Sequence, residues 1–359
     1  MTDNAPSATP AAATHAAAPH GRDHLDLAPR TGGEVRLAAR PVGRPAPADF
    51  RLLTVAVHPP APGEVLVRNR YFSLDAALRL RLSDVGVAMP PLAVGEALAG
   101  DAVGEVMASA SPGLAVGDTV RHGFGWREYV TAGADRFRRI DPDAFPTLAA
   151  HLASFPTAWV GLVDVAGISP GETVFVSGAA GAVGGLAGQI ARLKGAGRVV
   201  GSAGSPAKVA HLVGDLGFDA AFDHHDGPII DRLREAAPHG VDVFFDTTGG
   251  EQLQAALEAM NPHGRVALCG VLGRQNGRAP GGEVDLTAAI GSRLTLRGFR
   301  TGEHAERLPR IQAEVAGWLR DGRLVLDQTV VTGLANAPRA FIDMLAGAYT
   351  GRVLVAPFG

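Results

Sequence analysis

Between residues 31 and 150 the apolar positions come in short runs separated by glycine and proline. The segments 65–68, 102–106 and 126–130 are such runs, and each lies near a glycine-containing turn. Short apolar runs between turn signals are typical of β-strands. This part of the chain is therefore expected to form a compact, β-rich, barrel-like domain.

From about residue 150 the pattern changes to an alternation of strands and helices. Nearly every position of the expected strands is apolar, as in parallel sheets that are covered by helices on both faces. The expected strands cover residues 173–177, 198–201, 241–246 and 264–269, and the expected helices cover residues 184–194, 205–216 and 253–260. After about residue 325 short strands return around one expected helix at 337–345.

These patterns divide the chain into three parts. Residues 1–30 are rich in alanine and proline and poor in large apolar groups, so we expect a disordered tail rather than a signal peptide. Residues 31–150 and 322–359 are expected to form the β-rich domain. Residues 151–321 are expected to form a doubly wound Rossmann domain inserted in it, which makes the fold class α/β.

The composition excludes several classes of protein but does not identify the function. A formal net charge of −3 over 359 residues provides no basic surface for nucleic acid. The single cysteine, Cys269, excludes a disulfide framework and any zinc site made of several cysteines. No apolar run reaches the roughly 18 residues that span a membrane. Without an export signal, a cytoplasmic enzyme is expected.

Residues 178–184 read Gly-Ala-Ala-Gly-Ala-Val-Gly and lie between an apolar strand and a helix. Small residues at this place let the backbone approach a pyrophosphate, whose charge is favoured by the positive end of the helix. A tight turn that packs helix on strand without any ligand is the other interpretation. The position of the motif in the strand–helix pattern favours dinucleotide binding.

The second strand of the expected Rossmann domain ends without an acidic residue. An NAD site places a carboxylate there for the ribose 2′-OH, whereas this strand leads into Gly204 and Ser205, and Lys208 follows one turn later. Hydroxyl groups and a cation suit a 2′-phosphate, so we expect NADP(H). Lys208 alone also suits an ordinary solvated lysine. The absence of an acidic residue after the strand is the stronger reason to expect NADP(H).

Further motifs along residues 35–357 resemble those of one family. The chain is similar to the zinc-independent medium-chain dehydrogenases/reductases, and most to the prostaglandin reductase (leukotriene B4 12-hydroxydehydrogenase) group of NADPH-dependent alkenal double-bond reductases. The matching stretches are Asn69–Asp75 with Arg79, Gly95-Glu96, Val103–Val106, Gly117-Asp118, Gly125-Trp126, Thr157–Trp159, Gly171–Ala191, Leu216–Ala221, Gly298-Phe299 and Asn336–Pro338 with Phe341.

The resemblance implies a catalytic, GroES-like domain built from both chain ends, a Rossmann domain in the middle and a nicotinamide in the cleft between them. It also implies homodimers and a small-molecule substrate. Zinc-dependent relatives bind their metal with a cysteine and a Gly-His-Glu segment, but the corresponding Gly95-Glu96-Ala97 has no histidine. We therefore expect no catalytic metal, and we interpret the His224-His225 pair as loop residues.

Carried over by position, the resemblance also implies the cofactor contacts. The expected residues are Gly181, Ala182, Val183 and Gly184 at the pyrophosphate, Gly204, Ser205, Lys208 and His224 at the adenosine phosphate, Cys269, Gly270 and Val271 near the nicotinamide half, and Phe299 on the stretch that lines the cofactor pocket. Two of them have equally good structural interpretations. Cys269 suits a small buried strand residue with an inert thiol, and Phe299 suits core packing.

Several residues depart from the family pattern at functional positions. The pocket tyrosine of the family is Ala77 here, and the tyrosine whose hydroxyl assists the substrate carbonyl is Gln275. A tyrosine near the adenosine phosphate becomes His224, and an asparagine that helps to hold the cofactor becomes Tyr349. Enone reduction builds charge on the carbonyl oxygen, which needs a hydrogen-bond donor. The candidate catalytic residues are Tyr71, Gln275 and Tyr349, although Tyr71 also suits the core and Gln275 a solvent-facing loop.

The sequence thus predicts an NADPH-dependent oxidoreductase that transfers hydride to the C=C bond of an α,β-unsaturated carbonyl compound. Two alternatives stay open. The lost tyrosines are compatible with a different acceptor, such as a quinone, ketone or imine in specialised biosynthesis. The same departures are compatible with a cofactor-binding protein that has a non-redox role.

Overall fold

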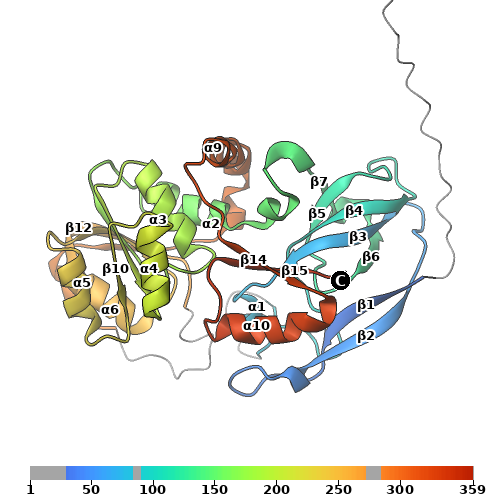
Figure 1. The fold of residues 1–359 in the computed structure, drawn as a ribbon, viewed down its shortest axis with the longest axis horizontal. Coiled ribbons are helices and arrows are strands. Elements are labelled where there is room, and N and C mark those ends of the chain that lie inside the picture. Colours follow the sequence, from blue (N-terminus) through green and yellow to red (C-terminus); the bar gives the residue numbers. More distant parts are fainter. Residues whose placement is uncertain (1–29, 84–89, 272–283, 359) are drawn as a thin grey trace, which may run out of the picture.

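The computed structural model describes residues 30–83, 90–271 and 284–358, so Gln275 and residues 1–29 of the expected tail lie outside the described residues. Arg30, the last residue of that tail, begins strand β1 (Arg30–Leu37). The described chain forms two lobes, with helices α3 to α6 in one and strands β1 to β7 in the other (Figure 1).

The first lobe is built on a six-stranded parallel sheet. Its strands are β8 (Thr173–Val176), β9 (Arg198–Ala203), β10 (Ala220–Asp223), β11 (Val241–Asp246), β12 (Met260–Leu268) and β13 (Thr295–Gly298). Their order is β10-β9-β8-β11-β12-β13, so the chain runs outward in one direction from β8 and in the other from β11. This reversal is the point at which doubly wound sheets bind ligands, at the carboxyl ends of the strands.

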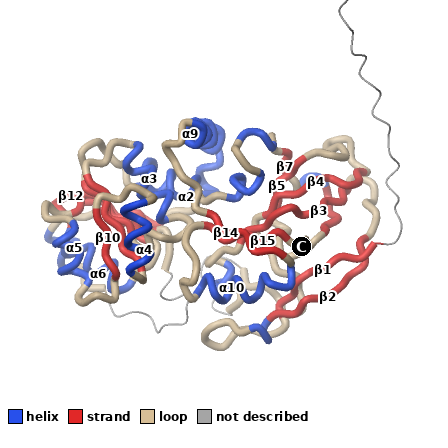
Figure 2. The backbone as a smooth tube through the Cα atoms, viewed as in Figure 1, coloured by secondary structure: helices blue, strands red, loops and turns tan. Residues whose placement is uncertain are grey.

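Helices cover both faces of this sheet because successive apolar side chains of each strand point to opposite sides. Val174 and Val176 pack with one set of helices, and Phe175 packs with the other. The first set is α2 (Phe155–Trp159), α3 (Gly184–Leu193), α4 (Pro206–Gly214) and α9 (Leu308–Arg320); the second is α5 (Ile229–Ala236), α6 (Gly250–Ala259) and α8 (Thr287–Gly291). Figure 2 shows the strands of this lobe lying between helices. The predicted α/β fold class is confirmed.

The second lobe combines strands from both ends of the chain. The sheet order is β14-β15-β3-β4-β5-β7, with β6 on β3 and with β1 and β2 forming a separate pair. The strands are β2 (Phe50–Val57), β3 (Glu64–Ser73), β4 (Ala102–Ser109), β5 (Thr119–His122), β6 (Tyr129–Gly133), β7 (Arg138–Arg139), β14 (Gln328–Thr332) and β15 (Arg352–Ala356). Two helices belong here, α1 (Leu78–Arg81) and α10 (Ala337–Leu345). The domain limits at 150/151 and 321/322 stay predictions.

One expected strand is placed differently. Residues 126–130 were expected to be extended, but β6 begins at Tyr129 and Trp126 has a positive φ of 62°. The turn directs the fully buried indole of Trp126 against Phe72 and Phe341, with ring centroids 5.6 and 5.7 Å apart. Burial of this large ring outweighs the local strain. None of the described helices has the length and apolar character needed to cross a membrane.

Candidate functional site

The glycine turn, residues 178–184, connects β8 to α3 at the point where the sheet order reverses. Gly178 has a φ of 57°, a conformation that favours glycine. A Cβ on Gly184 would lie 2.5 Å from the carbonyl oxygen of Gly178 and 2.8 Å from Cα of Ala179. The first helical turn thus lies directly on the strand end, and only a residue without a side chain fits there.

The same turn meets the requirements of a pyrophosphate site. Gly181 is exposed and Ala182 and Val183 are small or partly exposed, so backbone groups are accessible in front of α3. Within the described part of the chain, the N–H groups of Ala182 and Val183 donate to no backbone carbonyl outside the helix. Such N–H groups at a helix start bind anions. The residues present therefore fit the dinucleotide that the family implies.

At the neighbouring strand end, Ser205 caps helix α4. Its Oγ accepts a hydrogen bond from the backbone N of Lys208 at 3.4 Å, which satisfies one N–H of the first turn. The side chain of Lys208 is not an isolated solvated cation, since its Nζ donates to the carbonyl oxygen of Gly347 at 2.7 Å. Burial lowers the pKa of Lys208. The sequence did not foresee this link to the C-terminal segment.

His224 and Gly204, both expected at the adenosine phosphate, lie together. A Cβ on Gly204 would be 3.1 Å from Cε1 of His224, and Nδ1 of His224 lies 2.6 Å from the carbonyl oxygen of Ala203. Beside His224 an open hollow of about 360 Å³ lies between α5 and α6, lined also by Glu251 and Gln254. Its volume is in the range of small-ligand sites.

Asp246, at the carboxyl end of β11, is a buried polar group that the sequence analysis did not single out. Its Oδ1 accepts hydrogen bonds from Ser177 Oγ at 2.8 Å and from the backbone N of Thr248 and of Gly249, both at 2.9 Å. Its Oδ2 is buried and has no hydrogen-bond partner among the described residues. Burial raises the pKa of Asp246 against these hydrogen bonds. A carboxylate that directly follows the apolar run Val243–Phe245 was the available signal.

Cys269 lies directly after β12 beside this carboxylate. Its backbone N donates to the carbonyl oxygen of Asp246 at 2.8 Å, as does that of Gly270 at 3.1 Å. Burial, together with the negative charges of Asp246 and Asp75, raises the pKa of the Cys269 thiol to about 12. A thiol of this kind stays protonated and unreactive at neutral pH. Val271, the next expected contact, is 45% exposed at the edge of the described segment.

Phe299 follows β13 and packs into the Rossmann lobe. Its ring centroid lies 6.4 Å from that of Phe245, in an edge-to-face arrangement. A Cβ on Gly161 would lie 2.7 Å from Cζ of Phe299, so the ring rests on the π-helix Val160–Val165. This contact supports the core-packing interpretation, while a role at the cofactor stays a prediction.

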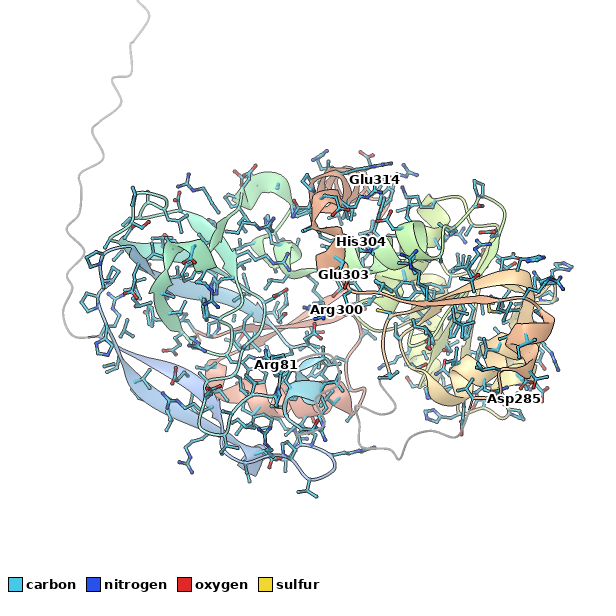
Figure 3. The ribbon with its side chains drawn as sticks, turned by 180° about the vertical axis from the view of Figure 1, so that it is seen from behind. Arg81, Asp285, Arg300, Glu303, His304 and Glu314 are labelled. Atoms are coloured by element: carbon cyan, nitrogen blue, oxygen red, sulfur yellow. The ribbon has the colours of Figure 1, made fainter. Side chains whose placement is uncertain are left out.

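The segment after Phe299 is held against α2 and the π-helix that follows it. Thr301 Oγ1 lies 3.1 Å from Thr157 Oγ1, and His304 Nδ1 lies 3.4 Å from Asp164 Oδ2. Figure 3 shows Glu303 and His304 between the two lobes, below the helix that carries Glu314. π-Helical turns are frequent at functional sites, and this one positions the segment that leads out of the parallel sheet.

The two described catalytic candidates lie in different apolar clusters. Tyr71 is on β3, and its ring packs beside Val103. Tyr349 lies between α10 and β15 and packs against the cluster that includes α10. Two residues later, the backbone N of Gly351 donates to the carbonyl oxygen of Ala180 in the glycine turn at 2.9 Å. The structure thus brings the segment of Tyr349 to the expected cofactor turn, and the cluster of Tyr71 includes Leu354 on β15, three residues beyond Gly351.

Among the described residues, one group of three side chains is close enough to share a metal ion. Asp223, His224 and His225 offer ligand atoms that all lie within 4.8 Å of one another. This group follows β10 in the Rossmann lobe. The segment Gly95-Glu96-Ala97, where zinc-dependent relatives hold their metal, belongs to the other lobe.

The fold and the glycine turn define the class of protein: a two-lobed oxidoreductase with a dinucleotide-binding Rossmann lobe. Two family models match the chain. One, described as the N-terminal domain of oxidoreductase, matches residues 34–140, and the other, described as zinc-binding dehydrogenase, matches residues 182–316.

Individual relatives match nearly the whole chain. It is 34% identical to the NADPH-dependent curcumin reductase of Escherichia coli over 90% of this chain and 96% of the relative, and 35% identical to prostaglandin reductase 1 of Bos taurus over 88% and 95%. Among solved structures, CurA of Vibrio vulnificus in complex with NADPH superimposes with a TM-score of 0.85 at 31% identity, covering 91% of this chain and 99% of CurA.

The chain therefore belongs to the medium-chain dehydrogenase/reductase family, in the group that contains the prostaglandin, alkenal and curcumin reductases. The resemblance stated from the sequence is confirmed. The protein is an oxidoreductase of this group, and the curcumin and 2-alkenal reductases in the group are named as NADPH- and NADP(+)-dependent.

Proposed function

We propose that this protein reduces the C=C bond of an α,β-unsaturated carbonyl compound with NADPH and without a metal ion. The observation that carries the proposal is the glycine turn at the point of strand reversal, in a chain that matches named NADPH-dependent reductases over nearly their full length. A curcumin, prostaglandin or alkenal substrate is named for these relatives. The reductase chemistry that these relatives share, and not any one of their substrates, is the basis of the proposal for this chain.

The cofactor is held along the carboxyl edge of the parallel sheet. Residues 181–184 bind the pyrophosphate at the start of α3. Gly204, Ser205 and Lys208 bind the adenosine 2′-phosphate, and the hollow beside His224 accepts the adenine ring. No carboxylate follows β9 that would repel a 2′-phosphate.

The residues at the carboxyl ends of β11 and β12 would hold the nicotinamide half. Bound NADPH supplies the hydride, and the protein supplies binding, orientation and a dry environment. Asp246, with its pKa raised by burial, orders Ser177, Thr248 and Gly249 at the strand ends that would hold the nicotinamide half. The thiol of Cys269 remains protonated, so it acts as an apolar wall and not as a nucleophile.

The substrate oxygen gains negative charge and requires a hydrogen-bond donor. Tyr349 is the described candidate whose segment contacts the glycine turn, since Gly351 donates to Ala180. Tyr71 and Gln275 remain further candidates, Tyr71 within an apolar cluster and Gln275 outside the described residues. A tyrosine hydroxyl can both donate to the oxygen and pass on a proton.

The proposal also includes a homodimer, a reaction without a metal ion and a cytoplasmic location. The parallel sheet ends at β13, which pairs only with β12 among the described strands, and an open edge of this kind supports pairing with a second copy in a homodimer. The segment Gly95-Glu96-Ala97 offers one carboxylate, which supports chemistry without zinc. A cytoplasmic location remains the expectation from the sequence.

The test follows NADPH oxidation by the purified full-length chain across a panel of enones and enals. We expect the absorbance at about 340 nm to fall with at least one class of acceptor, and deuteride from labelled NADPH to appear at the β-carbon of the product. Dialysis against a chelator should leave the rate unchanged. If bound NADPH is consumed only with quinones, ketones or imines, the alternative acceptor replaces this proposal.

A product labelled at the carbonyl carbon would contradict C=C reduction in the same experiment. If NADPH binds but no acceptor consumes it, the non-redox interpretation is favoured. The measurement uses the intact chain, so it includes Gln275 and the rest of residues 272–283.

A further inference from the structure

One side of a helical segment in the Rossmann lobe faces the chain that leaves strand β13. The segment consists of α2 and the π-helix Val160–Val165, which follows α2 without a break. Thr157, Gly161 and Asp164 lie on this segment at steps of four and three residues, the spacing of residues on one side of a helix. We call these three positions the contact stripe.

Gly161, in the middle of the contact stripe, leaves room for two aromatic rings. A Cβ at this position would overlap Cε2 of Phe245 on β11 and would lie 2.7 Å from Cζ of Phe299. The two ring centroids are 6.4 Å apart in an edge-to-face arrangement, so the rings also support each other. The missing side chain of Gly161 thus determines how closely Phe299 approaches the helix.

Two polar contacts hold the same chain on either side of Gly161. Thr157 Oγ1 lies 3.1 Å from Thr301 Oγ1, and Asp164 Oδ2 lies 3.4 Å from Nδ1 of His304. Both side chains of the second contact are largely shielded from water, with 14% of Asp164 and 20% of His304 exposed. Residues 299–304 are consequently held at three points along the contact stripe.

The helical segment is itself fixed to its surroundings. Arg265 on β12 donates through Nε to the carbonyl oxygen of Ala166, directly after the π-helix, at 2.8 Å. Trp159, directly before the π-helix, donates through Nε1 to Oε2 of Glu314 on α9 at 3.0 Å. Because both ends of the π-helix are bonded to other elements, the contact stripe has a defined place relative to the strand ends.

The position of Phe299 matters because of the sheet edge at which it lies. Leu268 and Gly298 are opposite each other on the parallel strands β12 and β13. Cys269 and Phe299 come next along the chain, so both lie at the carboxyl ends of adjacent strands. Doubly wound sheets bind their ligands at this edge. A shift of the Phe299 ring would therefore displace the chain beside the strand ends that would hold the nicotinamide half.

We propose that Gly161 is a positioning residue for hydride transfer, which acts by setting the place of the Phe299 ring and of residues 299–304. This inference rests on the proposed function because it requires NADPH at this edge of the sheet. Hydride transfer depends on the alignment of two reacting atoms, and a misplacement of about 1 Å can cost about 100-fold in rate. The residues expected at the pyrophosphate and the adenosine phosphate lie elsewhere, at 181–184 and 204–208, so the affinity for NADPH should depend little on Gly161.

The experiment compares Gly161→Ala with the wild type, as intact proteins, with NADPH and the acceptor that the wild type reduces fastest. We expect the single-turnover rate of NADPH oxidation at saturating substrate to fall about 10- to 100-fold, while the Kd of NADPH changes less than about threefold. A purely structural effect would lower the melting temperature and the amount of folded protein, but not the single-turnover rate of the folded complex.

Gly302→Ala is the matched control, because this glycine lies in the same segment and no atom lies within 4 Å of the added Cβ. It should keep the wild-type rate within about twofold. A double-mutant cycle then tests whether Gly161 acts through Phe299. In the background of Phe299→Leu, whose shorter side chain leaves space for the new methyl group, Gly161→Ala should lower the rate less than about threefold.

Equal single-turnover rates of Gly161→Ala and the wild type would overturn the inference and leave the proposed function standing. The inference would also be overturned if Gly161→Ala slowed the reaction equally in both backgrounds, since the effect would then not pass through Phe299. If Gly161→Ala does not fold, Phe299→Leu and Thr301→Val probe the same support, and wild-type rates in both would count against it. A wild type that binds no NADPH, or never oxidises it, would refute the proposed function and this inference together.

Discussion

At the scale of single residues, the site depends on the absence of a side chain at Gly184 and on the buried carboxylate of Asp246. Gly184 brings the start of α3 against the end of β8, and no side chain fits between them. Asp246 accepts four hydrogen bonds on one oxygen and has a second oxygen buried without a partner among the described residues. Both features position backbone N–H groups around the expected dinucleotide.

Substitution of Gly184 by valine should abolish tight cofactor binding. The new Cβ would lie 2.5 Å from the Gly178 oxygen, so the turn must open and its N–H groups lose their alignment. We expect NADPH affinity to fall at least tenfold and unfolding free energy to fall by about 1–3 kcal/mol, as in overpacked cores. Fluorescence titration and urea denaturation measure the two effects.

Gly317→Ala in α9 is the control for this glycine, since nothing lies within 4 Å of the added Cβ. It should raise stability slightly, because glycine in a helix interior is unfavourable by about 0.5–1 kcal/mol, and leave NADPH binding unchanged. Equal NADPH affinity of Gly184→Val and the wild type would show that the turn does not hold the cofactor.

The choice between two tyrosines can be decided kinetically. Tyr349→Phe removes the hydroxyl next to the segment that contacts the glycine turn, and we expect kcat with an enone to fall about 100-fold, as for loss of one oxyanion donor. Tyr71→Phe keeps the ring that packs beside Val103 and should change kcat less than about threefold. Stopped-flow measurement of single-turnover NADPH oxidation separates both effects from binding. The reverse order of the two losses would assign the donor to Tyr71.

At the scale of elements, the carboxylate of Glu314 joins three helices that pack on one face of the parallel sheet. Glu314 on α9 accepts a hydrogen bond from Trp159 Nε1 on α2 at 3.0 Å and also pairs with Lys194, which follows α3. The Lys194 Nζ lies 5.3 Å from the ring centroids of both Trp159 and Trp318. One carboxylate thus fixes how α2, α3 and α9 meet.

Glu314→Ala should destabilise the protein by about 1–3 kcal/mol, because it leaves the Trp159 N–H and the Lys194 ammonium without their acceptor. Glu314→Gln retains an oxygen for Trp159 and should cost less. Thermal unfolding followed by circular dichroism measures both. Equal melting temperatures for the alanine variant and the wild type would contradict the role of this contact.

At the scale of the whole molecule, helix α4 is fastened to the C-terminal segment by two side chains. Lys208 donates to the Gly347 carbonyl, and His211 Nε2 lies 2.9 Å from Oδ2 of Asp327, just before β14. His211 Nδ1 also lies 2.6 Å from Asp215. The helix expected to carry the 2′-phosphate site is therefore connected to the segment that continues into Tyr349.

The link through His211 predicts a pH-dependent stability. Burial favours the neutral ring, but the hydrogen bonds and charges of Asp215 and Asp327 outweigh it and raise the pKa of His211. Because the folded-state pKa is raised, the stabilisation is complete below the unfolded-state pKa and is lost as the pH rises through the folded-state value. His211→Gln should therefore lower stability at pH 6 by up to about 1 kcal/mol and have little effect at pH 9.

Urea denaturation of both proteins at the two pH values tests this link, with His239→Gln as the control because His239 is exposed on the surface. A stability difference of the same size at pH 6 and pH 9 would rule out a charged His211 as its source.

The α/β architecture and the position of the glycine turn follow from the order of residues along the chain. Val243, Phe244 and Phe245 are consecutive apolar residues, and only a sheet covered on both faces buries all three. The strand–glycine–helix order of residues 173–193 is a local pattern, so it could be recognised from neighbouring residues.

Contacts between residues far apart in the chain could be known only from the folded structure. Lys208 meets Gly347, Gly351 meets Ala180, and the buried Asp246 receives Ser177. No periodicity specifies such pairs, because they depend on how the two lobes and the ends of neighbouring strands are packed. Burial and proximity, which set the charge state of Asp246 and Cys269, exist only once the chain is folded.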